Sequence, residues 1–293
     1  GEALNVKPDH KEAQELKAQI EQETPAILNQ FVSQEFPLYL DLDLIKKGLK
    51  AGLLSSSAGK MLILDADSDT LVTIELAKKS HQIQSGKDGL GNGQLASLNG
   101  NFAFVYSKDK GIIRVDITSQ KVTEVSKADD GWGDILDISG FASNVYLLDT
   151  KNNQIWKYLV TTDGYSDKRE YLTKDTKVDL ANTVRMQIES SVYVLKSTGE
   201  MLRFTRGAKD NFSYGGLDQK LKDPKSFFVS SDTDNLYVLD SGNSRLLILT
   251  KTGGYKGQIT GEKFATTTDL VVDEKGKKVY LLEGSKIYHV DLK

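Results

Sequence analysis

Short apolar runs and polar turns follow one another in a pattern that occurs six times along this chain. Each copy has a short apolar strand that ends in an acidic or polar residue, then a turn and a second apolar strand. The first strands of the copies are 61–65, 102–107, 145–149, 192–196, 236–240 and 279–283. Their last residues lie 42 to 47 positions apart. A repeat of this length that contains strands and no helical pattern is typical of a β-propeller blade.

The most regular copy is the segment 225–260. Its apolar runs are 226–229, 236–239, 245–249 and 255–259. The residues between them are rich in Asp, Ser, Asn and Gly, which favour tight turns. Four antiparallel strands joined in this way form one blade. The pattern therefore predicts an all-β fold, a six-bladed β-propeller of four-stranded antiparallel blades that occupies residues 36–293.

The last copy has only three strands, which are 269–272, 279–282 and 286–291. Near the beginning of the chain, residues 38–45 alternate leucine with polar residues, which predicts a half-buried strand that has no blade of its own. An unpaired strand edge promotes aggregation. We therefore expect this N-terminal strand to pair with the last copy and close the ring.

Residues 1–35 are predicted to form a helical leader or stalk. Asp9 and Glu12 fit a capping box, and residues 11–23 are rich in good helix formers. Thr24 and Pro25 predict the start of a second helix. The leader would pack on the rim of the ring or continue a stalk. Because the chain begins with Gly and not Met, we expect it to be processed and to follow a membrane anchor that lies outside this sequence.

Pro224, Asp240, Asn243 and Arg245 follow the spacing of a known motif. This segment resembles the NHL repeat, and residues 149–156 resemble a second, looser copy. The resemblance implies a six-bladed propeller. Propellers of this kind include lactonases, strictosidine-synthase-like proteins, lyases, and binding or sensor modules of bacterial surface proteins.

Composition excludes several classes of function. The net charge of −3 gives no general attraction for a phosphate backbone, so we expect no nucleic-acid partner. No run of about 18 apolar residues is present, so we expect no membrane span. The chain has no cysteine, which removes disulfides, thiolate metal sites and cysteine nucleophiles together.

Histidines and carboxylates give little support for catalysis or metal binding. The three histidines are scattered and predict neither a triad nor a metal cluster. Asp65, Asp67 and Asp69 have a spacing that suits calcium, but Thr70 and Leu76 stand where a calcium loop needs Gly and Glu. The acidic residues that end the strands are better explained as acceptors for turn amides. We therefore expect no catalytic residue and no cofactor, with calcium as the alternative.

The loops between the copies carry the candidate ligand-binding residues. In the segment 127–134 a tryptophan stands between two glycines and near several carboxylates. A tryptophan in such a loop either plugs the channel mouth or recognises a partner. Further candidates on the same face are a tyrosine before the fourth copy, an arginine within it and a tyrosine after it. The predicted site residues are Trp132, Asp130, Asp134, Tyr165, Arg185 and Tyr214.

A rigid ring presents six sets of variable loops around one axis, so recognition needs no cofactor. We therefore expect a monomeric, non-catalytic binding module that takes a protein, a glycan or a small ligand on one face. We expect it to be the extracytoplasmic or cell-surface part of a larger membrane-anchored bacterial protein. A calcium-dependent lactonase or hydrolase, and a structural assembly module, are the alternatives.

Overall fold

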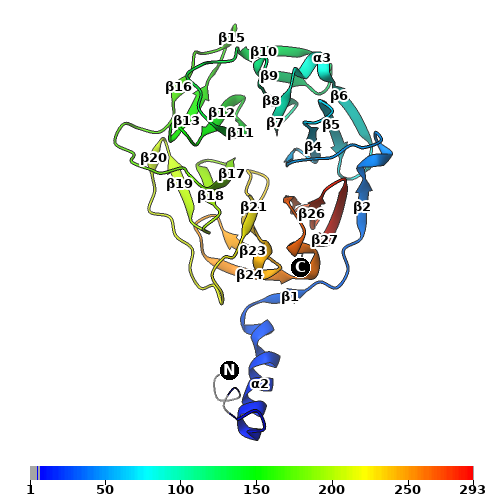
Figure 1. The fold of residues 1–293 in the computed structure, drawn as a ribbon, viewed down its shortest axis with the longest axis vertical. Helices are drawn as coiled ribbons and strands as arrows, with labels where there is room; N and C mark the ends of the chain where they lie inside the picture. The colour runs from blue at the N-terminus through cyan, green and yellow to red at the C-terminus, as the bar shows by residue number, and fades with distance from the viewer. Residues whose placement is uncertain (1–4, 6, 293) are drawn as a thin grey trace.

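Six antiparallel sheets surround a central axis in the computed structural model, which describes residues 5 and 7–292 (Figure 1). Blade 1 contains β3 (Leu54–Ser57), β4 (Lys60–Asp65), β5 (Thr70–Glu75) and β6 (His81–Ser85). Blade 2 contains β7 (Gly93–Asn99), β8 (Phe102–Ser107), β9 (Gly111–Asp116) and β10 (Val122–Ser126), and the short helix α3 (Lys87–Leu90) precedes it. Blade 3 contains β11 (Ile135–Phe141), β12 (Asn144–Asp149), β13 (Gln154–Tyr158) and β16 (Arg169–Glu170), with the hairpin β14–β15 (Val160–Thr161, Gly164–Tyr165) before β16.

The second half of the ring repeats this arrangement. Blade 4 contains β17 (Thr183–Ile188), β18 (Val192–Lys196), β19 (Met201–Thr205) and β20 (Ala208–Lys209). Blade 5 contains β21 (Pro224–Phe228), β22 (Asn235–Asp240), β23 (Arg245–Thr250) and β24 (Tyr255–Thr260). Blade 6 contains β25 (Asp269–Asp273), β26 (Lys278–Glu283) and β27 (Lys286–Asp291). The six-bladed propeller predicted from the repeat is thus confirmed, and each predicted strand is the second strand of a blade.

The N-terminal segment closes the ring, as the pattern of residues 38–45 predicted. Strand β2 (Leu38–Asp41) pairs antiparallel with β27, with Leu40 opposite Ile287, and becomes the fourth strand of blade 6. Before it, β1 (Gln30–Val32) adds a fifth, parallel strand to blade 5. No sequence pattern predicted β1, which is held by tertiary contacts such as the 2.6 Å hydrogen bond from the Tyr255 hydroxyl to the Leu28 carbonyl.

Within the described residues of the leader, 11–27 form a continuous helix, α2 (Lys11–Ile27), which extends away from the ring (Figure 1). Its N-cap is His10, whose Nδ1 accepts a 3.3 Å hydrogen bond from the Ala13 amide, so the predicted capping box at Asp9 is wrong. A second helix does not start at Thr24, because Pro25 lies within the last turn of the same helix. Within the described residues, no helix has the length and apolar character that a membrane crossing requires.

The hydrophobic core lies between neighbouring blades and not at the centre of the ring. For example, Leu195 of blade 4 packs in one cluster with Phe227 and Val238 of blade 5, and all three are fully buried. Three short helical turns cap the blades: η1 (Leu42–Leu44), η2 (Ser241–Asn243) and η3 (Glu262–Ala265). Apolar side chains therefore hold the blades together, and polar side chains lie along the central axis.

The innermost strands of neighbouring blades are joined by side chains. Polar residues of one inner strand accept hydrogen bonds from the backbone of the next, which satisfies N–H groups at the inner edge of each sheet. The acceptor and donor pairs are Ser55 with Leu98 (2.9 Å), Ser97 with Gly140 (3.1 Å), Asp137 with Met186 (2.8 Å), Gln187 with Val229 (3.2 Å) and Asp269 with Leu54 (2.6 Å). The hydroxyl of Ser226 completes the ring by donating to Asp269.

Residues that end the second strands hold the loops in place, as the turn interpretation predicted. Asp149 accepts a 2.8 Å hydrogen bond from the Gly133 amide and a second of 2.8 Å from the Trp156 indole. Asp240 likewise accepts from the Lys222 amide (2.8 Å) and pairs with Arg245 (2.7 Å). These carboxylates are fully buried, and both take part in the hydrogen bonds just described. They fix the loops and do not face a ligand.

Candidate functional site

The two faces of the ring carry different connections. The connections from one blade to the next lead to one face, which we call the loop face; these connections are residues 86–92, 127–134, 171–182, 210–223 and 261–268. The turns between the first and second strands of each blade lie on the opposite face, which we call the turn face; these are residues 58–59, 100–101, 142–143, 189–191, 229–234 and 274–277. Each inner strand therefore runs from the loop face to the turn face.

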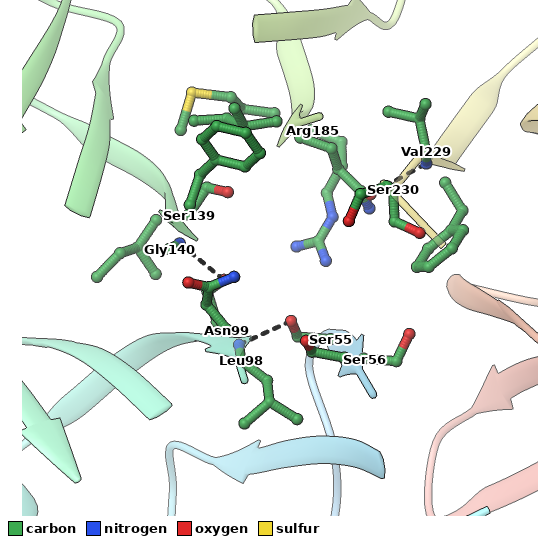
Figure 2. Close-up of a pocket in the computed structure, with 18 of the residues that line it drawn as sticks. Ser55, Ser56, Leu98, Asn99, Ser139, Gly140, Arg185, Val229 and Ser230 are labelled. Atoms are coloured by element: carbon green, nitrogen blue, oxygen red, sulfur yellow. Dashed lines mark hydrogen bonds between the residues drawn. The ribbon is translucent and has the colours of Figure 1, made fainter. Parts of the chain in front are cut away.

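A polar cavity of about 70 Å³ lies in the channel toward the turn face (Figure 2). Its wall comes from the ends of five inner strands and is dominated by hydroxyl and amide side chains. The polar lining residues are Ser55, Ser56, Ser57, Ser97, Asn99, Ser139, Arg185, Gln187, Ser230, Ser231 and Asp232. We call it the channel cavity. Its wall can donate several hydrogen bonds to a small molecule.

Arg185 crosses the channel and closes the cavity on the side of the loop face. Its guanidinium donates a 2.6 Å hydrogen bond to the Leu54 carbonyl of blade 1 and lies 3.5 Å from the carboxylates of Asp137 and Asp269. Figure 2 shows this guanidinium pointing toward the middle of the cavity. Among the described residues, no hydrogen-bond partner exists for its buried Nε atom. That N–H group is therefore an unsatisfied buried donor.

The repeat itself places these three charged residues. Asp137, Arg185 and Asp269 each pair with the next-to-last residue of the second strand in their blade. A bulge just before Asp137 and before Arg185 shifts the strand register. Bulges redirect side chains without interrupting a sheet. The three residues thus occupy equivalent positions in three blades and converge on the axis.

Burial and charge act against each other in this cluster. Burial disfavours the charged guanidinium, but the carboxylates of Asp137 and Asp269 outweigh it and raise the pKa of Arg185 above its usual range. Burial raises the pKa of the Asp137 carboxyl, and Arg185 and the Met186 amide offset only part of that effect. Arg185 is therefore a permanent cation that is already paired. A divalent cation at these carboxylates would have to displace it.

A wider groove of about 530 Å³ adjoins the cavity on the turn face. We call it the turn-face groove. Ser56, Ser57, Phe228, Ser230 and Asp232 line both spaces, so the two lie side by side. The remaining groove residues combine apolar and charged groups: Ala58, Gly59, Leu76, Val272, Asp273, Glu274 and Lys275. A ligand in the groove would extend a part of itself into the channel cavity.

The tryptophan loop predicted from the sequence lies on the loop face. Trp132 is half-buried, donates a 2.9 Å hydrogen bond from Nε1 to the Tyr158 hydroxyl and packs edge-on against Tyr106. It joins the apolar cluster between blades 2 and 3. Asp130 and Asp134 are exposed in the same loop. The channel is thus crossed by Arg185 and not covered by Trp132.

The other residues predicted for the site, Tyr165, Tyr214 and Arg185, lie apart from the tryptophan loop. Tyr165 lies on the turn face, because its hydroxyl donates a 3.1 Å hydrogen bond to Ser143 in the turn between β11 and β12. Tyr214 is on the loop face, where it lines a separate pocket of about 440 Å³ with Leu217 and Leu221, and burial raises its pKa to about 12. Arg185 alone of the six lies in the channel cavity. The structure thus distributes the predicted site residues over four places: the tryptophan loop, the turn face, the pocket beside Tyr214 and the channel cavity.

The calcium-like spacing at Asp65 forms a closed turn. Asp65 accepts from the amides of Asp67 and Ser68, and Asp69 accepts a 2.7 Å hydrogen bond from Gly93. These carboxylates point to the backbone and not to a common centre. Within residues 5 and 7–292, no three histidine, aspartate or glutamate side chains gather in a way that would hold a metal ion.

The serines of the cavity are the residues that sequence reasoning missed. Ser55, Ser97 and Ser139 occupy matching places in the inner strands of blades 1 to 3. They recur every 42 residues, which is the interval of the repeat itself. A polar residue that recurs at an inner strand is the signal that could have identified the channel wall.

Comparisons with known proteins support the fold alone. No protein-family model matches the chain, and no curated protein sequence does either. Solved six-bladed neighbours include virginiamycin B lyase from Staphylococcus aureus, with a TM-score of 0.56, 14% identity, and coverage of 85% of this chain and 82% of the other. A gluconolactonase from Xanthomonas campestris gives a TM-score of 0.54 at 12% identity, covering 80% and 82%. An auxiliary nutrient binding protein from Bacteroides thetaiotaomicron gives 0.54 at 15% identity, covering 82% and 68%. The structural neighbours thus include both enzymes and binding proteins, and the NHL family is not established by them.

Proposed function

We propose that this protein is a non-catalytic binding module whose ligand is a small polar molecule that enters the central channel from the turn face. The observation that carries the proposal is the buried, unpartnered Nε atom of Arg185. The residue as a whole is 4% exposed and lies at the closed end of a hydroxyl-lined cavity. A buried donor without a partner costs free energy, so a ligand that accepts its hydrogen bond recovers that cost.

Binding explains the cavity wall better than acid–base catalysis does. A general acid or base needs a pKa near the working pH and must reach the reacting atom. Arg185 stays protonated, and the only other titratable side chain among the described lining residues is Asp232 at the rim. The wall thus supplies donors that fix a ligand and few groups that could move a proton. The nutrient-binding neighbour gives this proposal a structural parallel.

The helix α2 supports the remainder of the proposal. It stands away from the ring and contacts the propeller mainly near β1 (Figure 1). A stalk of this kind would hold the ring at a distance from a surface, with the binding face accessible. We therefore propose an extracytoplasmic or cell-surface location for the module.

Blocking the cavity tests the proposal. Ser56 lines both the cavity and the groove, and within the described residues its hydroxyl has no hydrogen bond. Ser56→Trp should fill the entrance without removing a structural contact. Ser213→Trp, at an exposed position that lines neither the cavity nor the groove, is the matched control.

A library of small polar compounds, including sugars, polyols, amino acids and carboxylates, would be screened by saturation-transfer-difference NMR. We expect at least one compound to bind the wild-type protein and the Ser213→Trp variant, and to lose at least tenfold in affinity with Ser56→Trp. Ligands that bind Ser56→Trp as tightly as wild type would place the site elsewhere. A library with no binder at all would also contradict the proposal.

A further inference from the structure

We infer that the ligand of the channel cavity and turn-face groove is a neutral, polyhydroxylated compound of the sugar class and not an anion. The inference rests on the proposed function, because it names the chemistry of a ligand at that same site. Hydrogen-bond capacity, charge, size and the apolar part of the groove each bear on it.

The cavity wall offers hydroxyl hydrogens. Ser55, Ser57 and Ser97 each use their oxygen to accept an amide hydrogen from the neighbouring blade, at 2.9 Å, 3.0 Å and 3.1 Å. A serine hydroxyl that accepts in this way still has its own hydrogen to donate. Together with the Arg185 Nε–H, these groups form a row of donors. Ligand oxygens are the matching acceptors.

The charges favour a neutral ligand. The guanidinium of Arg185 faces two buried carboxylates, Asp137 and Asp269, so this cluster carries more negative than positive charge. Asp232 adds a further negative charge at the rim of the cavity, and in the groove Asp273 and Glu274 outnumber Lys275. Within a site of low dielectric constant, an anion would be repelled by these groups. A hydroxyl group pays no such penalty and can both donate and accept.

The rim provides the complementary acceptor. Asp232 is exposed and lines both the cavity and the groove. Its backbone amide is held by a 3.1 Å hydrogen bond to the Ser230 hydroxyl oxygen, so the turn that carries it is fixed. The Glu274 carboxylate, in contrast, already accepts hydrogen bonds from the Tyr237 hydroxyl at 2.6 Å and from the Asp234 amide at 2.7 Å. Asp273, which also lines the groove, accepts a 2.9 Å hydrogen bond from the Gly276 amide. Asp232 is therefore the carboxylate best placed to accept from sugar hydroxyls.

Size and apolar contact fit the same class. A cavity of about 70 Å³ accommodates the volume of roughly two water molecules, at about 30 Å³ each. It would hold one hydroxymethyl group or a pair of hydroxyls, whereas the groove of about 530 Å³ has room for a sugar ring. Leu76, Phe228 and Val272 line the groove and would contact the C–H face of such a ring.

Matched pairs of sugars and sugar acids test the inference. The probes are glucose with glucuronate, galactose with galacturonate, and maltose as a longer neutral ligand, measured by isothermal titration calorimetry. We expect a neutral probe to bind at least tenfold more tightly than its acid. Asp232→Asn should weaken that binding by about tenfold, because it removes a hydrogen bond to a charged acceptor. Asp130→Asn, an exposed change on the loop face, is the control and should have no effect.

The outcomes separate the inference from the function on which it rests. Neutral binding that is lost in Ser56→Trp and weakened in Asp232→Asn supports both. If an acid binds more tightly than its neutral partner and Ser56→Trp abolishes that binding, the inference is overturned and the binding function stands. If no sugar or sugar acid binds while another polar compound binds and is lost in Ser56→Trp, the inference is again overturned alone. If Ser56→Trp changes no binding, both are overturned.

Discussion

Replacing Arg185 with methionine should destabilise the propeller strongly. The side chain is 4% exposed and lies 3.5 Å from the carboxylates of Asp137 and Asp269, which are 2% and 0% exposed. At an effective dielectric constant of about 20, each attraction amounts to about 5 kcal/mol before desolvation is counted. Arg185→Met removes both attractions and leaves two buried carboxylates and the Leu54 carbonyl without their shared donor.

Breaking a buried ion pair from one side typically costs about 3–5 kcal/mol. In a chain of 293 residues, this corresponds to a decrease in the melting temperature of roughly 5–8 °C. The loss should be larger at pH 7 than at pH 5. Burial already raises the pKa of Asp137, and removing the guanidinium raises it further, so the folded variant gains a proton, and stability, as the pH falls.

Differential scanning calorimetry at the two pH values would measure these effects. Asp137→Asn and the double variant Asp137→Asn with Arg185→Met complete a double-mutant cycle. We expect the double variant to lose less stability than the sum of the single changes. A decrease of less than about 2 °C for Arg185→Met, or strict additivity in the cycle, would refute the idea that this cation balances the buried carboxylates.

Three further predictions concern the rest of the ring. Deleting residues 36–45 removes β2 and should lower the melting temperature by at least 10 °C or abolish soluble monomer. Deleting α2 should change the melting temperature by only a few degrees. Equal decreases for the two deletions would contradict the closure of the ring by β2. Hydrogen bonds outweigh burial and lower the pKa of Asp149, so its stabilising effect is present above its unfolded pKa and is lost as the pH falls through the folded pKa. Urea unfolding of Asp149→Asn should therefore show a loss of about 1–3 kcal/mol at pH 7 that shrinks toward pH 3, and a loss constant with pH would contradict this. Trp132→Phe removes the hydrogen bond to Tyr158 and should cost about 1 kcal/mol while ligand binding is unchanged; a loss of binding in a titration would show that the tryptophan loop belongs to the site.

Much of the fold could be predicted because its signals are local and repeated. A short apolar run that ends in a polar residue marks the second strand of every blade, and the missing strand in the last copy pointed to residues 38–45. Strand β1 could not be predicted, since three residues carry no pattern and its pairing with β24 is a tertiary contact. The helix start expected at Thr24 was wrong because α2 continues through Pro25 and ends two residues later, at Ile27.

The candidate site was less accessible to sequence reasoning. Arg185 was identified, but a polar residue on an inner strand looks the same in sequence whether it faces solvent or the channel. The bulge that brings Arg185 toward Asp137 is a shift of one residue in pairing, and neither residue type nor spacing signals it. Trp132 attracted attention because a tryptophan between glycines is unusual in a loop. Its contacts with Tyr158 and Tyr106 come from strands that only the fold brings near.

A crystal structure of the protein soaked with the tightest-binding polar compound tests the location of the site most directly. We expect the compound in the turn-face groove, with one of its oxygen atoms about 3 Å from Nε of Arg185 and its ring against Phe228. A compound bound in the loop-face pocket beside Tyr214, with the Arg185 Nε still unpartnered, would contradict the proposed site.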